Sequence, residues 1–523
     1  MGENNTVDTA EKQLWLDRAQ IAGVDDESAL ERIGQLIDRS GDLRWVEGLE
    51  CGVTLCCELR ERTDSERISA ISLYFESNAL EDLRRLRRSH DELWNWEQPE
   101  YEEEIVLLRR ADRLAEHASV DVVRRAQIAT NLANALSHVG RTVEAIAYWN
   151  KALQLNHPFP MARGNRGFGL YYYGQRTHDL GHQFLLLRHA YADLKEAVNA
   201  SSHPEVKQRF SVPADKIEEF FGVERLTRDF DLNAHSLGKS DEEIAYRRWA
   251  LQRYLFLNPL NDLGPNMISA ADTLMLPGIV VPLSEGPYYL GFFNQMKQEF
   301  VSARYLYFAG ISSSEPHFSD RDVKMTDTLD YPSYSLAVEQ VKAAFRIAYS
   351  IFDKVAYFLN HYLCLGIHEN DVTFRTLWYH GRKKERGVRE ELINLRNIPL
   401  QALFWVSKDL YERKPGFEEA LEPDAQEVAA IRNYIEHKYL KLHEFGRPMK
   451  PESEAARALA DTLAYSVGRS EFERKTLRML VLTRTTLLYL TQVVHLEEHR
   501  RREGVKGLIA PMELDSYEDE WKY

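Results

Sequence analysis

The sequence is poor in cysteine and has no excess of positive charge. Its 523 residues include four cysteines, and 66 Lys and Arg stand against 81 Asp and Glu, for a formal net charge of −15. Cys51, Cys56 and Cys57 share one apolar run, and no second Cys/His cluster with zinc-ligand spacing accompanies it. We therefore expect no metal site, and small buried residues of a reduced protein instead. The acidic balance excludes a basic field over the whole chain, so any nucleic-acid site must be a local patch.

Signals for export and for membrane insertion are also missing. The N-terminus is polar and acidic, unlike a signal peptide, and its formal myristoylation pattern M-G-E-N-N-T has no basic patch beside it. The most apolar window, L-V-L-T-R-T-T-L-L-Y-L-T-Q-V-V, is short and contains Arg484, which predicts a buried helix. We expect a soluble, cytoplasmic protein with no membrane partner.

Motifs for the common cofactors are absent as well. The sequence contains no G-x-x-x-x-G-K, no G-x-G-x-x-G after a strand and no G-x-S-x-G. Carboxylates occur mainly in runs such as P-E-Y-E-E-E, which are typical of a solvated face. No bound cofactor is therefore expected.

The chain does contain an internal repeat. Asn131, Ala133 and Gly140 are matched by Asn165, Gly167 and Gly174 one period later, at about the 34 residues typical of tetratricopeptide repeats. The small residues predict a close approach of two helices, and the last glycine of each set predicts a tight turn. A third copy, from Gly238 to Leu251, matches the segment that begins at Gly140. Such arrays form a concave surface for a peptide or protein.

The helical pattern predicts an all-α protein in which tetratricopeptide-like repeats precede a helical bundle. Prolines and a glycine in L-N-P-L-N-D-L-G-P end the repeats, and long helical segments follow Tyr331, with candidates at 338–363, 390–412, 424–445, 453–466 and 470–500. The predicted parts are a tail at 1–24, repeats at 25–257, a loop-rich connection at 258–330, a bundle at 331–510 and an acidic tail at 511–523.

The segment 424–445 carries the residues best suited to chemistry. Asn433 and His437 are four apart and share one helical face, Arg432 lies beside it, and Tyr439 is expected under Arg432. An imidazole can take the proton of a ribose 2′-hydroxyl, and a guanidinium can bind the phosphate. A predicted buried stripe of Val428, Ile431, Ile435 and Leu442 faces the bundle.

At these residues the chain resembles the HEPN superfamily, whose motif is an arginine, a polar residue and, a few positions later, a histidine. The match is Arg432-Asn433 with His437, and Lys438-Tyr439 is similar to the His-x-Tyr ending of HEPN toxins. The resemblance implies a homodimer with one composite, metal-independent RNA-cleaving site. It assigns phosphate binding to Arg432, orientation to Asn433, acid–base catalysis to His437 and a supporting or modified role to Tyr439.

The motif is short, and the same spacing recurs by chance. Arg85–His90 lies in a basic helical face, and Arg375–His380 has no asparagine after the arginine and ends at a loop. At the preferred copy the ordinary alternative is an exposed Arg432–Glu436 pair beside a surface histidine.

The segment 380–389, H-G-R-K-K-E-R-G-V-R, predicts a basic loop bounded by glycines. Its cations Arg382, Lys383 and Lys384, together with Lys438 near the motif, are the candidates for RNA backbone binding. Lys441 and His443 are expected to add positive charge there, and a solvated loop is the alternative for 380–389.

Three functions remain open. The first is an endoribonuclease effector in phage defence or toxin–antitoxin-like growth arrest, with the repeats as sensor or regulator. The second is a non-enzymatic adaptor whose repeats bind a protein and whose bundle dimerises. The third is a transcriptional or signalling regulator, which is weakened because no helix-turn-helix with a basic recognition helix stands out.

Overall fold

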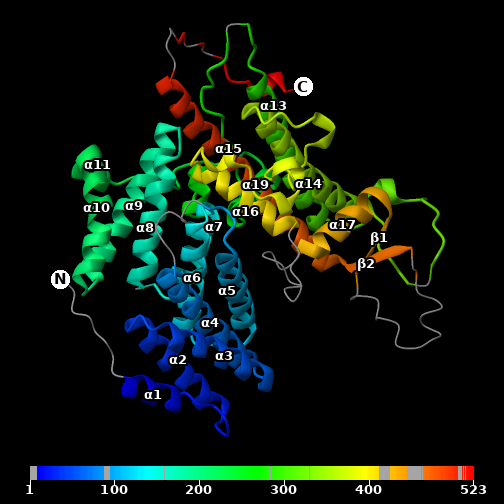
Figure 1. Ribbon diagram of the computed structural model, residues 1–523. Helices are drawn as coiled ribbons and strands as arrows, with labels where there is room; N and C mark the ends of the chain where they lie inside the picture. Colours follow the sequence, from blue (N-terminus) through cyan, green and yellow to red (C-terminus); the bar gives the residue numbers. More distant parts are fainter. Residues whose placement is uncertain are drawn as a thin grey trace.

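The computed structural model describes residues 9–87, 95–157, 159–282, 284–328, 330–411, 425–444, 461, 463–504, 509–510, 512 and 514–522. These residues are almost entirely α-helical, as the sequence predicts, with one pair of short strands. In Figure 1 the first helices form a stack, and the later helices form a bundle across its upper end.

The helices of the stack and its continuation are α1 Thr9–Arg18, α2 Asp26–Asp42, α3 Val46–Arg62, α4 Glu66–Arg87, α5 Pro99–His117, α6 Val122–His138, α7 Thr142–Leu155, α8 Pro160–Gln175, α9 Leu180–Ala200, α10 Pro204–Phe221, α11 Val223–Thr227 and α12 Asp241–Gln252. The later elements are α13 Tyr288–Ser312, α14 Leu336–Tyr362, α15 Glu390–Ile393, α16 Ile398–Tyr411, α17 Ala425–His437, β1 Tyr439–His443, β2 Ala464–Gly468 and α19 Arg469–Gly504. Short 3₁₀ turns connect several of them.

Consecutive helices from α2 to α10 pack against one another, which is the arrangement of a helical repeat. Local sequence sets where several helices begin. The side chains of Asp121, Asp179 and Ser335 each accept a hydrogen bond from a backbone N–H in the first turn of α6, α9 and α14. These caps satisfy donors that a helix cannot satisfy internally.

The glycines of the repeat have different functions in the structure. Gly140 has φ +87° in the turn between α6 and α7, as predicted. A Cβ on Gly167 would lie 2.9 Å from Leu194 Cγ, which confirms the predicted close helix approach. The turn predicted at Gly174 is wrong, because this residue lies inside α8. It makes room instead, since a Cβ there would lie 2.8 Å from Leu187 Cγ.

The third repeat-like segment forms α12 but does not pair with another repeat helix. The α12 helix packs against α13, and the Trp249 ring lies 5.8 Å from the Tyr307 ring. The α13 helix falls within 258–330, so the expectation of a loop-rich stretch is wrong there. Aromatic side chains such as Phe293 and Phe300, which are 1% and 0% exposed, bury it in the bundle.

Two predicted bundle helices are also corrected. The segment 390–412 is broken between α15 and α16, where Arg396 adopts φ +48° and Pro399 lies in the first turn of the next helix. Residues 464–466, predicted as helical, belong to β2, and 453–460 lie outside the described residues.

The strand β1 runs parallel to β2, with Tyr439 opposite Ala464 and His443 opposite Gly468. The predicted helix 424–445 therefore ends at His437, because the next residues satisfy their backbone groups in this ladder.

The helix α19 is long and apolar enough to cross a membrane by length and composition. However, 83% of its most apolar 18-residue window is buried inside the fold, as in a core helix and consistent with a soluble protein. Arg484 is 1% exposed and donates to Asp262 Oδ1 at 2.7 Å. The prediction of a buried helix around Arg484 is confirmed.

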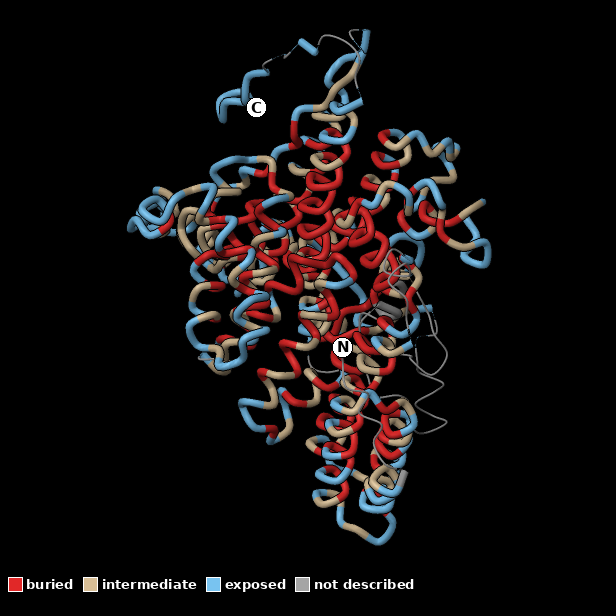
Figure 2. The backbone as a smooth tube through the Cα atoms, turned by 60° about the vertical axis from the view of Figure 1, so that its left-hand side comes forward, coloured by how far each residue is buried: buried red, intermediate tan, exposed pale blue. Residues whose placement is uncertain are grey.

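Buried charges join the stack to the bundle. Asp409 of α16 accepts from Arg109 of α5 at 3.0 and 3.1 Å and also from Arg141, which pairs with Glu144. Tyr489 of α19 donates to Glu144 at 2.6 Å. The two parts share one hydrophobic core, and Figure 2 shows the buried backbone concentrated where they meet. The bundle is thus held firmly against the repeats.

Candidate functional site

The helix α17 carries most of the predicted catalytic residues. Val428, Ile431 and Ile435 are at most 6% exposed, which confirms the predicted buried stripe on this helix. Leu442 is 1% exposed as well, but it lies in β1. The stripe presses α17 against α14 and α16 and thereby fixes which residues face outward.

Asn433 and His437 are exposed on the outer face of α17, one turn apart, as the sequence predicts. His437 is the last residue of the helix. Lys438 follows it, is exposed, and has its ammonium 4.8 Å from the centre of the Tyr434 ring.

Arg432 points to another side of the helix. It is half-buried, and its guanidinium lies 5.4 Å from the centre of the Tyr349 ring of α14. The described structure shows no contact between Arg432 and His437. The expected alternative, an Arg432–Glu436 pair, is not formed either, because Glu436 lies 3.8 Å from Arg346.

Tyr439 does not lie under Arg432, and this part of the prediction is wrong. The chain changes from helix to strand after His437, so Tyr439 follows the direction of β1. Its hydroxyl lies 2.7 Å from the hydroxyl of Tyr334. Burial and this hydrogen bond raise the pKa of Tyr334 to about 12.

Two further cations near the motif are not available to a ligand. Lys441 is 3% exposed and lies 2.6 Å from Asp330 and 2.8 Å from Asp461. His443 is 5% exposed, with Nδ1 3.0 Å from the backbone oxygen of Asp330. The expectation that they add surface charge is therefore wrong, since the strand turns both side chains inward.

The basic loop forms two 3₁₀ turns closed by a hydrogen bond from His380 N to Gly387 O at 3.1 Å. Gly381 and Gly387 adopt φ +56° and +75°, so the predicted glycine boundaries are required by the backbone. His380 accepts from the backbone of Glu390 at 3.3 Å, which gives it a structural contact.

A cavity of about 550 Å³ opens beside this loop. We call it the cationic cavity; its lining includes Arg375, Arg382, Lys383, Lys384, Lys408 and Tyr411. The three predicted loop cations are thus brought together at one surface. Arg382 also forms an ion pair with Asp371 at 2.7 Å.

Two tyrosines link the cationic cavity to the motif. Tyr411 lines the cavity, and its ring lies 6.4 Å from the Tyr349 ring at 90°. Burial raises the pKa of Tyr349, while the guanidinium groups of Arg432 and Arg375 oppose that rise. Arg432 is not among the residues that line the cavity, and it lies behind it, against the Tyr349 ring.

Sequence reasoning missed Arg375, Tyr349 and Tyr411. Arg375 was set aside with His380 as a chance spacing, but it lines the cavity through its own position. No local pattern identifies the two tyrosines, because α14, α16 and α17 are distant in the sequence and meet only in the bundle.

The floor of the cationic cavity is tied to the repeats. Lys408 lines the cavity and forms a buried ion pair with Glu102 of α5. One residue later, Asp409 binds Arg109 of the same repeat helix. The helix α16 thus contacts the cavity on one side and the repeat stack on the other.

The candidate site is thus an Arg–Asn–His motif on a helix of the bundle, with the cationic cavity beside it. Residues 280–497 match the family model described as LA2681-like HEPN. The match supports a HEPN-superfamily domain in this part of the chain, and it begins before α13, earlier than the predicted bundle. No curated protein matches the chain.

Proposed function

We propose that the protein is a metal-independent endoribonuclease that needs no cofactor and is regulated by its helical repeats. HEPN-superfamily domains are generally of ribonuclease type, and residues 280–497 resemble one. The observation that carries the proposal is an exposed His437 at the end of α17, on the helix whose Arg432 is connected to the cationic cavity through the rings of Tyr349 and Tyr411.

In this mechanism RNA lies along the cationic cavity with its phosphates near Arg382, Lys383 and Lys384. Lys438 adds charge beside the motif, and Arg432 binds the phosphate under attack.

The neutral imidazole of His437 takes the proton of the ribose 2′-hydroxyl, and the 2′-oxygen attacks phosphorus. The bond to the 5′-oxygen breaks, and that oxygen receives a proton from an acid in the site. The products carry a 2′,3′-cyclic phosphate and a 5′-hydroxyl. Asn433 orients the substrate, and Tyr439 has a supporting role through Tyr334.

The active form in this proposal is a homodimer. Within one chain Arg432 leans toward α14 while Asn433 and His437 face outward. A second copy facing the same surface brings the missing groups to each site and supplies the acid for the leaving oxygen. The setting we propose is cytoplasmic growth arrest, in phage defence or as a toxin-like effector.

Comparison of the wild-type protein with His437→Ala tests this function. Each is incubated in EDTA with mixed tRNA and with single-stranded RNA, and the product ends are analysed. We expect loss of cleavage by about 10²–10⁴-fold in His437→Ala, the range for removal of a general acid–base group. His235→Ala, at another exposed histidine, is the control and retains activity.

An adaptor without enzymatic activity is the second candidate. The lack of contact between Arg432 and His437 in the described chain favours it. If the RNA stays equally intact with wild type and with His437→Ala, at concentrations where the protein is dimeric, the protein is an adaptor.

A further inference from the structure

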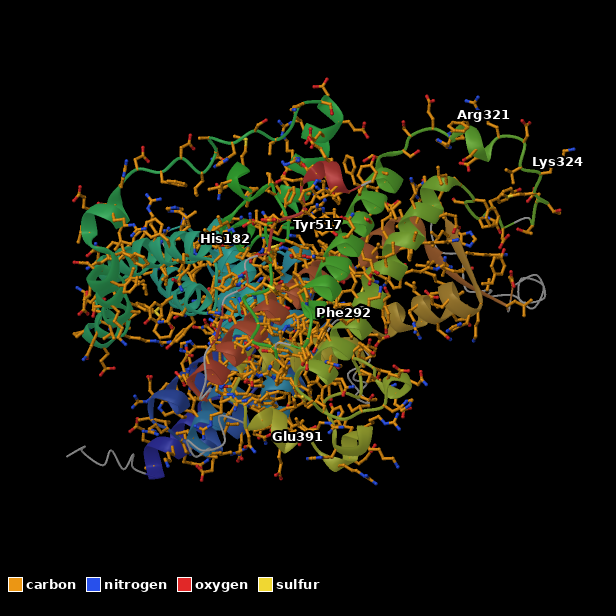
Figure 3. All side chains as sticks on the ribbon, turned by 90° about the horizontal axis from the view of Figure 1, so that it is seen from above. His182, Phe292, Arg321, Lys324, Glu391 and Tyr517 are labelled. Atoms are coloured by element: carbon orange, nitrogen blue, oxygen red, sulfur yellow. The ribbon has the colours of Figure 1, made fainter. Side chains whose placement is uncertain are left out.

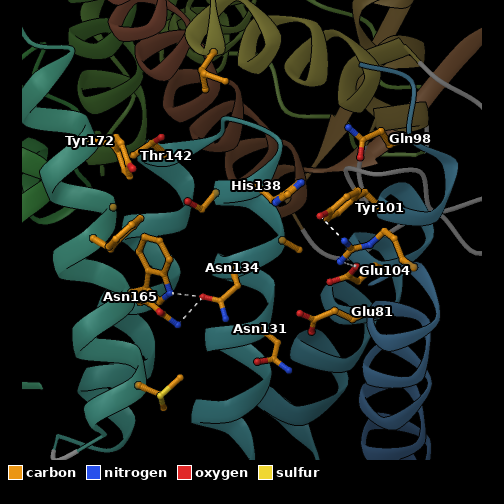
Figure 4. Close-up of a pocket in the computed structure, with 18 of the residues that line it drawn as sticks. Glu81, Gln98, Tyr101, Glu104, Asn131, Asn134, His138, Thr142, Asn165 and Tyr172 are labelled. Atoms are coloured by element: carbon orange, nitrogen blue, oxygen red, sulfur yellow. Dashed lines mark hydrogen bonds and ion pairs between the residues drawn. The ribbon is translucent and has the colours of Figure 1, made fainter. Parts of the chain in front are cut away.

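The repeat stack contains a cavity that is larger than the cationic cavity, and it lies outside the HEPN match apart from a contact with α16. Its volume is about 890 Å³, within the range of ligand sites. Helices α4 to α8 surround it (Figure 4). We call it the repeat cavity.

Two asparagines in the repeat cavity are oriented by a tryptophan. The indole Nε1 of Trp149 donates to Asn134 Oδ1 at 3.1 Å, and an indole N–H can only donate. The Asn134 oxygen is thereby fixed in place. Asn165 Nδ2 donates to the same oxygen at 3.1 Å, so its own oxygen must point elsewhere.

The oxygen of Asn165 has no hydrogen-bond partner in the described part of the chain. Asn165 is 7% exposed, lines the repeat cavity, and its Oδ1 is buried without a donor. Buried acceptors are satisfied in most proteins, and those that are not call for an explanation such as a missing ligand. Asn134 also lines the cavity and keeps its Nδ2 as a donor, so the two amides together offer a donor and an acceptor, as a peptide group requires.

The charged side chains of the lining indicate the charge of the ligand. Arg84 pairs with Glu104 at 3.0 Å, and Arg85 pairs with Glu81. Both glutamates of the lining are thus already neutralised by arginines on the same side of the cavity.

Two other arginines of the lining, Arg176 and Arg209, have no carboxylate partner among the described residues. Burial lowers the pKa of Arg176 to about 10, so it remains a cation at neutral pH. It contacts Thr142 Oγ1 at 3.4 Å and lies 5.5 Å from the centre of the Tyr172 ring. A partly buried cation without a counter-ion favours an anionic ligand, on a chain whose net charge is −15.

The aromatic rings favour a peptide over a nucleobase. Tyr101 already stacks on His138 with ring centres 4.3 Å apart, and Arg84 lies 3.6 Å from its ring centre. Trp149 is 2% exposed. These rings offer little face for a base to stack on. The Tyr172 ring of the lining is 39% exposed, but it packs edge-on against Phe168 at 5.1 Å and lies 5.5 Å from the Arg176 guanidinium.

We propose that the repeat cavity binds an extended acidic peptide segment of a partner protein. A peptide group of the ligand bonds to Asn134 and Asn165, and a carboxylate of the ligand binds Arg176. This deepens the regulatory part of the proposed function by giving the chemistry of the partner, and it does not depend on cleavage by His437.

Selection from a phage-displayed library of random octapeptides on the full-length protein tests the site. Binding of a selected peptide, made with a fluorescent label, is then measured by fluorescence polarisation. We expect selected sequences rich in Asp and Glu, and at least tenfold weaker binding to Arg176→Gln and to Asn165→Leu. Arg110→Gln, an exposed arginine on α5, is the matched control and binds as wild type does.

Several outcomes overturn the proposal. They are a selection that enriches no acidic sequence, binding that both variants leave unchanged, and competition by adenosine monophosphate at equal concentration. Arg176→Gln decides the matter if Asn165→Leu fails to fold, since Arg176 is only partly buried. His437→Ala is included and should bind the peptide normally, which separates failure of this site from failure of the ribonuclease proposal.

Discussion

The repeat stack and the bundle build their cavities from residues at very different distances along the chain. In the repeat cavity Asn134 binds residues 15 and 31 positions away, within one and two helices of the repeat. The cationic cavity combines a loop with α16, and it reaches Arg432 only through Tyr349 and Tyr411. A repeat therefore encodes its surface locally, whereas the bundle assembles its site from distant segments.

The two regions also differ in whether certain partly or fully buried arginines are neutralised by carboxylates. In the stack, Arg176 lines a cavity and has no counter-ion among the residues that the structure describes. Where stack meets bundle, Arg109 and Arg141 are neutralised by the fully buried Asp409. An arginine without a counter-ion, such as Arg176, is suited to bind an anionic ligand. The ion pairs of Asp409 instead hold the bundle against the stack.

The largest effect on this comparison is expected from Asp409→Asn. The change leaves two buried guanidinium groups uncompensated and should lower the free energy of unfolding by about 3–5 kcal/mol. Urea unfolding of the full-length protein measures it, with the exposed Asp64→Asn as control. A decrease smaller than about 1 kcal/mol, the size of an ordinary exposed ion pair, would show that the two regions are not joined by this network.

The same network predicts a pH dependence. Burial alone would raise the pKa of Asp409, but Arg109 and Arg141 outweigh it and lower the pKa from 3.8 to about 2. The stabilisation is therefore complete above the unfolded-state value of 3.8 and disappears as the pH falls toward 2. The difference in melting temperature between wild type and Asp409→Asn should shrink over that interval, and a constant difference contradicts the assignment.

RNA binding should depend on the loop of the cationic cavity. Replacing Arg382, Lys383 and Lys384 by alanine should make the slope of log K against log salt shallower, by about 0.7 for each phosphate of single-stranded RNA that the variant no longer neutralises. Filter binding at several salt concentrations measures it. The control replaces Arg321 and Lys324, which lie at the edge of the molecule in Figure 3. Equal changes of slope in both variants would indicate unspecific attraction.

A smaller effect is expected at the turn where the stack touches the bundle. Gly140→Ala places a side chain at φ +87° and a Cβ 2.8 Å from the backbone oxygen of Ile398. Stability should fall by about 1–3 kcal/mol, measured by thermal unfolding. Gly291→Ala in α13, where nothing lies within 4 Å of the added Cβ, should be neutral or stabilising. Similar changes in stability for both variants would show that the stack and the bundle do not approach closely at Gly140.

The smallest effect is expected from Tyr439→Phe. It removes the hydrogen bond to Tyr334 and should cost about 0.5–1.5 kcal/mol of stability, with RNA cleavage largely kept. Calorimetry and the cleavage assay follow both quantities, with Tyr334→Phe as the matched variant. A loss of cleavage as large as that of His437→Ala would give Tyr439 a direct part in the reaction.

Much of the fold follows from local signals. The glycine turn at Gly140 and the buried Val428, Ile431 and Ile435 of α17 are present in the structure as the sequence predicts. The errors fall where non-local pairing decides. The helix expected over 424–445 ends at His437 because β2, which follows β1 in the chain, supplies a strand partner.

The candidate site was predictable only in part. The spacing of Asn433 and His437 places them on one helical face, and the structure shows them there. The direction of Arg432 depends on Tyr349, which no spacing near residue 432 indicates. The partner of Tyr439 was likewise invisible, because Tyr334 approaches it through a loop.

The sequence by itself determined the helical class, the repeats, the motif on α17 and the basic loop, because each depends on residues within a few turns or one turn motif. Only the tertiary structure decided that Arg432 lies against Tyr349, that Lys441 and His443 are buried, and that Asn165 Oδ1 has no donor among the described residues. Those features depend on which surfaces meet when distant helices pack. Packing is set by the sum of many weak contacts rather than by any local pattern.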